Sequence, residues 1–269
     1  DFEEPTDIED FDLSWLHNRW AAKTVSKVGA RSAKARGGRG ALEISLRRED
    51  EMASKGKRAE LAVPFSYRRG REYWFGFSVY LPASWREDNK GDVVAQWFAH
   101  EDRHLGEKGR SPALALRLRK AFWYVTYRWD GRPVTPGNSA PKGKIFKGRY
   151  RRGVWTDWVF RIRFSYDEAA KGAKQGLVEV YKDGEKVAER RGPNTYNDRA
   201  GPTLKLGIYK APWNNPRAKS AFNKRLLYLD EVRVGDHRAG YAGVAPRPRR
   251  AASATRPTSN PTSTPAPKP

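Results

Sequence analysis

The sequence has no cysteine among its 269 residues. Disulfides, thiolate metal sites and cysteine nucleophiles are therefore excluded. It also has no apolar run near the roughly 20 residues that a helix needs to span a bilayer, so we expect no membrane as a partner. Acidic residues are scarce relative to basic ones: 31 Asp and Glu stand against 53 Lys and Arg, a formal net charge of +22.

This positive charge favours polyanionic partners such as nucleic acid or an acidic polysaccharide. The charge alone does not choose between them, and clusters of Lys and Arg also occur because they keep a protein soluble. No recognisable nucleic-acid-binding module accompanies the charge. Nucleic acid is therefore not the partner that we expect.

Long helices are also missing, since no segment with helical periodicity exceeds about ten residues. Aromatic residues are abundant instead, with 10 Trp, 12 Tyr and 11 Phe. Segments rich in aromatic and β-branched residues are typical of strands, and they cover 71–82, 92–100, 112–120, 121–131, 156–167, 177–191 and 226–236. Many strands separated by frequent turns predict an all-β domain, built as a two-sheet sandwich or jelly roll.

The end of the chain has a different composition. The last 24 residues hold 7 of the 18 prolines and no aromatic residue. Such a segment has almost nothing to bury, which predicts a disordered tail or linker over 241–269 behind a folded domain of residues 1–240. Pro/Ser/Thr-rich stretches of this kind often flank the domains of extracellular enzymes, so we expect a secreted protein.

Three strand-like segments combine an apolar face with a polar one, because alternate residues of a strand face opposite sides of a sheet. The side chains on the polar faces are Arg58 and Glu60 in 57–63, Gln96, Phe98 and His100 in 93–100, and Lys205, Gly207 and Tyr209 in 203–209. Strands that line a groove have this pattern, and so do strands with an ordinary solvated face. The glycine between the lysine and the tyrosine would leave room for a sugar ring.

The motifs "RAEL", "QWFAH" and "KLGIY" occur in the order and spacing of the jelly-roll polysaccharide lyases. The chain most resembles the heparin lyase I / glucuronan lyase group, and the alginate lyases of similar fold carry a related motif set. "GREYWFGFSVYLPASW" and "LLYLDEVRVGD" also match, so the resemblance covers about residues 1–236. It implies a concanavalin A-like β-jelly roll sandwich of two antiparallel sheets, an acidic polysaccharide as substrate, and a monomer.

The resemblance also implies roles for single residues. Tyr209 matches the catalytic tyrosine, Lys205 the lysine beside it, and Gln96 and Arg58 match residues that bind the substrate carboxylate. Phe98 stands where the related motif has histidine. His100 has the same parity and either replaces that histidine or is an incidental loop residue. Further residues that we expect to contact the substrate are Glu60, Arg117, Arg119, Lys210 and Trp213.

β-Elimination explains why these residue types would occur together. Donors such as Arg58 and Gln96 neutralise the uronate carboxylate and stabilise the charge that develops when the C5 proton leaves. A tyrosine ordinarily titrates near 10, and nearby cations favour its phenolate; Lys205, Lys210 and Arg58 are the candidates. In β-linked glucuronate and mannuronate, H5 and O4 lie on one side, so one tyrosine can act as base and then as acid. Loss of the histidine at Phe98 therefore favours such a substrate.

Two other functions compete with this prediction. A glycoside hydrolase needs paired carboxylates about 5–10 Å apart, and adjacent Asp230 and Glu231 would face opposite ways. A non-catalytic carbohydrate-binding module would keep the groove and the charge, but would not need Lys205 and Tyr209 together. The resemblance also suggests a structural calcium ion, with Asp230 and Glu3 (or Glu4) as its ligands. Alternatively, Asp230 is a hydrogen-bonded carboxylate at the end of its strand. We expect no organic cofactor.

Overall fold

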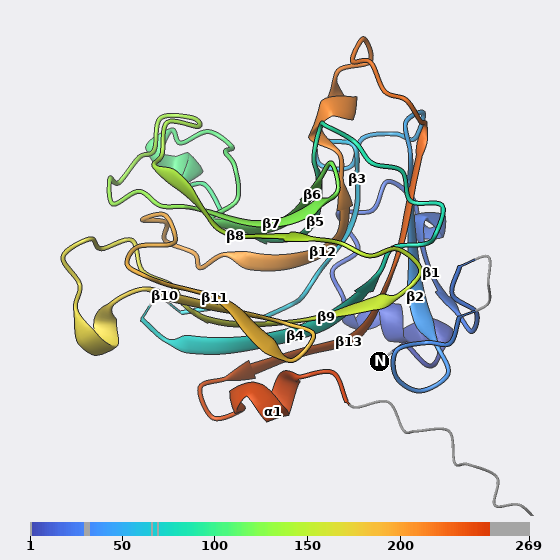
Figure 1. Ribbon diagram of the computed structural model, residues 1–269. Helices are drawn as coiled ribbons and strands as arrows, with labels where there is room; N and C mark the ends of the chain where they lie inside the picture. The colour runs from blue at the N-terminus through green and yellow to red at the C-terminus, as the bar shows by residue number, and fades with distance from the viewer. Residues whose placement is uncertain (1, 30–32, 66, 69, 248–269) are drawn as a thin grey trace, which may run out of the picture.

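Two antiparallel sheets, packed face to face, form the protein (Figure 1). The computed structural model describes residues 2–29, 33–65, 67–68 and 70–247. The seven-stranded sheet has the order β1-β2-β13-β4-β9-β10-β11, and the six-stranded sheet has the order β3-β12-β5-β6-β7-β8. Within the described part of the chain, regular helices are short and few. The predicted two-sheet jelly roll is therefore confirmed.

The seven-stranded sheet comprises β1 (Ala22–Val25), β2 (Ala41–Arg47), β13 (Lys224–Asp236), β4 (Glu72–Tyr80), β9 (Trp155–Arg163), β10 (Leu177–Lys182) and β11 (Glu185–Arg191). The six-stranded sheet comprises β3 (Arg58–Ala62), β12 (Thr203–Tyr209), β5 (Asp92–Phe98), β6 (Leu114–Arg119), β7 (Phe122–Arg128) and β8 (Lys142–Arg149). The helical segments are the 3₁₀ turns η1 (Pro5–Asp10), η2 (Arg19–Ala21), η3 (Arg103–Leu105), η4 (Gly172–Lys174) and η5 (Ala211–Asn214), and the α-helix α1 (Gly240–Val244).

The core between the sheets absorbs much of the aromatic content. Phe75 on β4 meets Trp97 on β5 with ring centroids 5.2 Å apart, and Phe160 on β9 lies 4.8 Å from the same Trp97. All three rings are fully buried. Because Trp97 points into the core, its neighbours Gln96 and Phe98 point to the other face of the six-stranded sheet. That face is concave in Figure 1, and loops rise around it.

The C-terminal part of the described chain folds back onto the seven-stranded sheet. Val244 of α1 is buried, and a side chain at Gly76 of β4 would lie only 1.8 Å from the Val244 carbonyl oxygen. The Arg247 N–H donates to Glu231 Oε2 at 3.1 Å. Residues 241–247, which the sequence suggested to be tail, thus pack on the folded domain. The rest of the predicted tail, 248–269, lies outside the described residues.

Over the residues that the structure describes, no helix is long and apolar enough to cross a membrane.

Candidate active site

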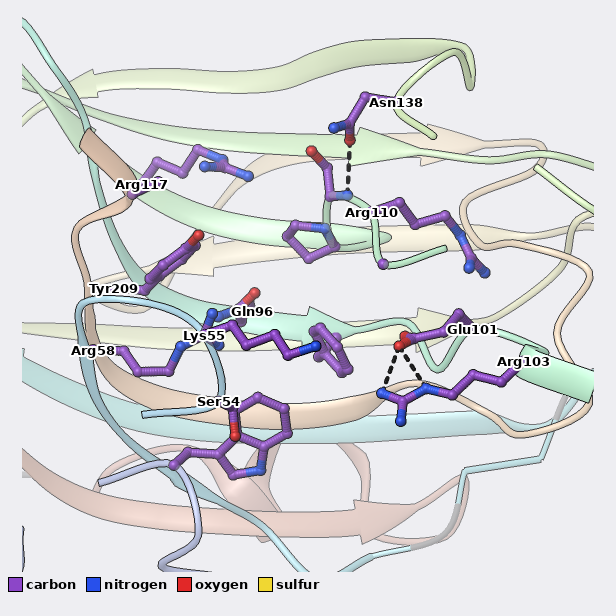
Figure 2. Close-up of a pocket in the computed structure, with 16 residues that line it drawn as sticks. Ser54, Lys55, Arg58, Gln96, Glu101, Arg103, Arg110, Arg117, Asn138 and Tyr209 are labelled. Atoms are coloured by element: carbon purple, nitrogen blue, oxygen red, sulfur yellow. Dashed lines mark hydrogen bonds and ion pairs between the residues drawn. The ribbon is translucent and has the colours of Figure 1, made fainter. Parts of the chain in front are cut away.

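The concave face of the six-stranded sheet contains a groove of about 890 Å³ (Figure 2). Its floor is formed by side chains from β3, β5, β6 and β12. The residues that line it are Trp15, Ser54, Lys55, Arg58, Gln96, Phe98, Glu101, Arg103, Gly109, Arg110, Ser111, Pro112, Arg117, Asn138, Tyr209 and Ala211. Four of the residues predicted from the sequence, Arg58, Gln96, Arg117 and Tyr209, are therefore part of one groove.

Strand register explains why these side chains meet. Tyr209 on β12 lies directly opposite Arg58 on β3, and residues directly opposite each other in an antiparallel pair share a face. On the other side of β12, β5 brings in Gln96. The Arg58 guanidinium carbon lies 4.2 Å from the centroid of the Tyr209 ring. The cation and the phenol are thus in direct contact.

Glu60 holds the floor of the groove together from below. Its side chain is completely buried. One carboxylate oxygen accepts a hydrogen bond from Arg58 Nη1 at 3.2 Å, and the other accepts one from Gln96 Nε2. Glu60 was expected to contact substrate; instead it orients the two residues that line the groove. Arg58 Nε is buried without a hydrogen-bond partner among the described residues.

The Tyr209 hydroxyl lies between polar groups of three elements. It accepts a weak hydrogen bond from Asn214 Nδ2 at 3.4 Å. Arg117 on β6 points into the groove from the same end (Figure 2), and its Nε donates to Thr126 Oγ1 at 3.0 Å. Burial, and secondarily Arg128, lower the pKa of Arg117 to about 10. Arg117 therefore keeps its charge at neutral pH, and Tyr209 has Arg58 and Arg117 as its cationic neighbours.

Lys205 lies on the predicted face of the sheet, but it does not lie beside Tyr209. It is completely buried, and its Nζ lies 3.3 Å from the centroid of the Trp15 ring and 3.6 Å from that of Phe98. Among the described residues it has no hydrogen-bond partner. Burial lowers the pKa of Lys205 to about 7, although Glu60 opposes the shift. The expectation that this ammonium lies beside the phenol is not met.

Gly207 is needed for a different reason than the one expected. Its φ is +141°, and an added Cβ would lie 2.2 Å from the Ala59 carbonyl oxygen on β3. The pairing of β12 with β5 also shifts register between Leu206 and Tyr209, as in a β-bulge. The close approach of β3 and the local bend, rather than room for a sugar, require glycine here.

Three further candidates lie outside the groove. The buried Lys210 Nζ binds Asp88 Oδ2 at 2.6 Å and Asp92 Oδ1 at 3.0 Å, which fixes a loop to the sheet. Trp213 is 1% exposed, so its ring offers no surface to a sugar. Arg119 is exposed at the end of β6, where its Nε donates to the Asn89 carbonyl oxygen. Lys210 and Trp213 therefore have structural roles.

His100 also lies off the groove. Its Nε2 is 2.7 Å from Thr203 Oγ1, and its ring meets Phe98 edge-on at 5.3 Å. Burial, together with the charge of Lys205, lowers the pKa of His100, so the ring is largely neutral at pH 7. The related motif has histidine at the position of Phe98, and these contacts do not put His100 in the place of that histidine.

We therefore expect His100→Gln to keep elimination activity within about threefold of wild type over pH 6–9, since the amide can still bond to Thr203. Steady-state rates on the best polymer measure this. A rate loss of a hundredfold or more, with the fold intact by circular dichroism, would return His100 to the reaction.

The turn over Ala53–Gly56 is a part of the site that sequence reasoning missed. Ser54 and Lys55 both have positive φ, 45° and 62°, the signature of a type I′ turn. An added Cβ on Gly56 would lie 2.7 Å from Arg58 Nη2 and 3.0 Å from Tyr209 Cε2. Lys55 extends over the groove in Figure 2. The "SKG" triplet carried a turn signal, but nothing local indicated that it covers the tyrosine.

The two carboxylates predicted to bind calcium, Asp230 and Glu3, accept backbone hydrogen bonds. Asp230 Oδ2 accepts the N–H groups of Arg36 and Gly37 at 2.8 and 3.0 Å, and Glu3 accepts that of Arg39. Both carboxylates thus bind amide groups of the 36–40 loop. Among the described residues, no three acidic or histidine side chains gather as a cation site. Asp230 and Glu3 do not fit a calcium cage.

The concave face of the jelly roll is thus lined by basic and aromatic side chains. A family model described as polysaccharide lyase matches residues 6–233. The chain therefore belongs to the polysaccharide lyase family, which confirms the resemblance seen in its motifs. A comparison with curated protein sequences gives no significant match.

Two solved structures share this fold, and a third is more distantly similar. The endo-β-1,4-glucuronan lyase of the fungus Trichoderma reesei is similar over 88% of this chain and 92% of its own, with a TM-score of 0.69 and 21% identity. A GH131 β-glucanase catalytic domain from Podospora anserina aligns over 84% of each chain, with a TM-score of 0.51 and 11% identity. An alginate lyase from Pseudomonas aeruginosa covers 73% of this chain and 82% of its own, with a TM-score of 0.45 and 17% identity.

Proposed function

We propose that this polysaccharide lyase cleaves a glucuronate-type anionic polysaccharide by β-elimination. The observation that carries the proposal is the cluster beneath the groove: Glu60 holds Arg58 and Gln96 side by side, and Arg58 lies 4.2 Å from the ring of Tyr209. Two donors for a carboxylate thus lie beside one phenol, which is the minimum set for removing a proton next to that carboxylate.

The reaction uses these groups in sequence. Arg58 and Gln96 bind the uronate carboxylate and stabilise the negative charge that spreads onto it as C5 loses its proton. Tyr209, as phenolate, takes that proton. The C4–O4 bond then breaks, a double bond forms between C4 and C5, and the proton passes from Tyr209 to the departing O4. The positively charged Arg58 guanidinium lies 4.2 Å from the Tyr209 ring. Because the proton that Tyr209 takes from C5 is given to O4, the enzyme ends the cycle in its starting state.

The substrate class is inferred from the groove's titratable groups. With His100 outside, the described residues that line the groove offer one phenol and no imidazole, which suits β-linked glucuronate, where H5 and O4 share a side. Among the described groove residues, Glu101 is the only carboxylate, and it is bound to Arg103 at 2.8 Å. A paired-carboxylate hydrolase mechanism is therefore disfavoured, although a β-glucanase shares the fold. The similarity to a glucuronan lyase supports the same substrate.

A substrate panel tests the proposal. Glucuronan, alginate, hyaluronan, heparin and heparan sulfate are each incubated with the protein, and the C4=C5 double bond of the product is followed by ultraviolet absorbance. We expect the fastest rise with glucuronan. A faster rise with alginate or heparin would show that this polymer, and not glucuronan, represents the preferred substrate class. Binding to these polymers with no absorbance change would identify a carbohydrate-binding module instead.

A further inference from the structure

A band of positive charge leaves the groove and crosses the six-stranded sheet to its edge strand β8. Lys142, Lys144, Lys147 and Arg149 of this strand are all exposed. None of the four binds a carboxylate of the described residues. Residues 112–156 contain 11 Lys and Arg but a single acidic residue, Asp130, which is already paired with Arg132.

Register places these cations on the same face as the groove. Arg117 lies opposite Tyr124 on β7, and Tyr124 lies opposite Lys147 on β8. The β7–β8 register shifts between Val125 and Thr126. The extra residue that this shift inserts in β8 keeps Lys144, opposite Thr126, on the concave side. A continuous row of side chains thus runs from Arg117, inside the groove, to the edge of the sheet.

Aromatic rings under the cations confirm that placement. Lys147 Nζ lies 4.4 Å from the centroid of the Phe122 ring, and Lys144 Nζ lies 5.6 Å from that of Tyr124. The core side of β8 carries Phe146, whose ring lies 5.8 Å from that of Trp158. The lysines of β8 therefore lie on the opposite, concave face.

Protection of an edge strand explains only part of this pattern. Lysine on an edge strand hinders pairing with another chain, which would account for β8 by itself. It does not account for Arg117 and Arg128 on the two interior strands β6 and β7, nor for the lack of acidic partners across all three strands. Unpaired cations with interleaved aromatic rings are what an anionic carbohydrate chain would use.

We propose that the concave face of β7 and β8 is a second binding region for the anionic polysaccharide, beyond the groove. Neighbouring strands lie about 4.8 Å apart, close to the length of one 1,4-linked sugar residue. From β12 to β8 there are four strand intervals, or roughly 19 Å. A chain that crosses the strands from Tyr209 thus meets Lys144 and Lys147 about four sugars away, where they bind uronate carboxylates. This proposal rests on the proposed function.

The test compares long and short substrates. The variant Lys144→Gln/Lys147→Gln removes two charges from β8, and Lys171→Gln/Lys174→Gln removes two exposed charges at η4, away from the concave face. We expect the β8 variant to lower kcat/KM on long glucuronan about fivefold to tenfold through KM, and to leave glucuronan trimers and tetramers unchanged. The η4 variant should leave both unchanged. Affinity of the β8 variant should also depend less steeply on salt, because fewer exposed charges are screened.

The outcomes separate this proposal from the proposed function. Equal losses on long and short substrates, equal losses in the η4 variant, or no loss at all would overturn the second binding region. If wild type eliminates none of the glucuronans, the proposed function fails, and equilibrium binding to glucuronan and alginate polymers is compared for the same variants. Weaker polymer binding in the β8 variant alone would then still support the region, and unchanged binding would overturn it.

Discussion

Tyr209→Phe is expected to lower the elimination rate by about 10²–10⁴, toward the upper end because one hydroxyl serves as both base and acid. The substitution removes only an oxygen. The ring contact with the Arg58 guanidinium at 4.2 Å remains, and so do the hydrogen bonds of Glu60 to Arg58 and Gln96. Substrate affinity and the free energy of unfolding should therefore change little, and the loss should be in kcat.

The measurement needs rate and affinity separately. Single-turnover absorbance gives the chemical step, equilibrium binding of the polymer gives affinity, and thermal unfolding checks the fold. Tyr241→Phe is a matched control, since Tyr241 lies on α1 and packs against Tyr181 on the other sheet. It should behave as wild type. If Tyr209→Phe kept near-wild-type elimination, Tyr209 would have only a packing role, and another base would have to be sought.

Strand parity alone predicted much of this site. The alternation in 57–63, 93–100 and 203–209 assigned Arg58, Gln96 and Tyr209 to polar faces, because a period of two is a local property of the backbone. The register of β3, β12 and β5 then brings those faces together. Strand parity does not predict which side chains on that face are exposed to the groove and which are buried beneath it. Glu60 has the right parity, yet it is completely buried beneath its neighbours.

Long-range contacts decided the other outcomes. Trp15 covers Lys205 because the N-terminal segment adds to the edge of β3, where the Glu60 N–H donates to the Trp15 carbonyl oxygen. Lys210 is withdrawn by Asp88, a partner 122 positions earlier in the chain. The local sequence pattern predicts neither contact, because the partners are far apart in the chain. Only the folded structure shows them.

Strand β8 was missed for a physical reason. Its sequence, "KGKIFKGR", has no alternation of large apolar and polar residues, which is the signal that predicts a half-buried strand. Its core side carries Phe146, whose ring covers Gly148, and Gly143, which Tyr127 of β7 covers. A strand with one large apolar side chain between two glycines on its core side has little alternating hydrophobic pattern by which to identify it. The unpaired cations on its open face were missed with it.

Lys205→Met is expected to make the protein more stable at and below neutral pH. Burial lowers the pKa of Lys205 from its ordinary value of 10.5 to about 7, a cost on the order of 5 kcal/mol for the folded ammonium. Contacts with the rings of Trp15 and Phe98 offset about 2 kcal/mol of it. Methionine fills the same space without charge. We therefore expect the free energy of unfolding to rise by about 3 kcal/mol.

The pH dependence of that gain follows from the direction of the shift. Below pH 7 the lysine is protonated in both states, so the folded state bears the whole cost and the variant gains most. Between pH 7 and 10.5 the folded lysine becomes neutral while the unfolded one stays charged, and the gain shrinks. Above pH 10.5 little remains. Urea unfolding at pH 6, 8 and 10 measures this course.

The activity of the Lys205→Met variant should change in the opposite sense. The Lys205 charge lies behind Phe98 and Trp15, which line the groove, and it favours a bound carboxylate. Its loss should lower kcat/KM about tenfold at pH 6 and little at pH 9, where wild-type Lys205 is already neutral.

Lys210→Met is the control: that lysine is buried but paired with Asp88 and Asp92, so its loss should destabilise the protein by about 3–5 kcal/mol. If Lys205→Met were also less stable at every pH, the ring contacts would outweigh the burial cost, and Lys205 would be a structural anchor.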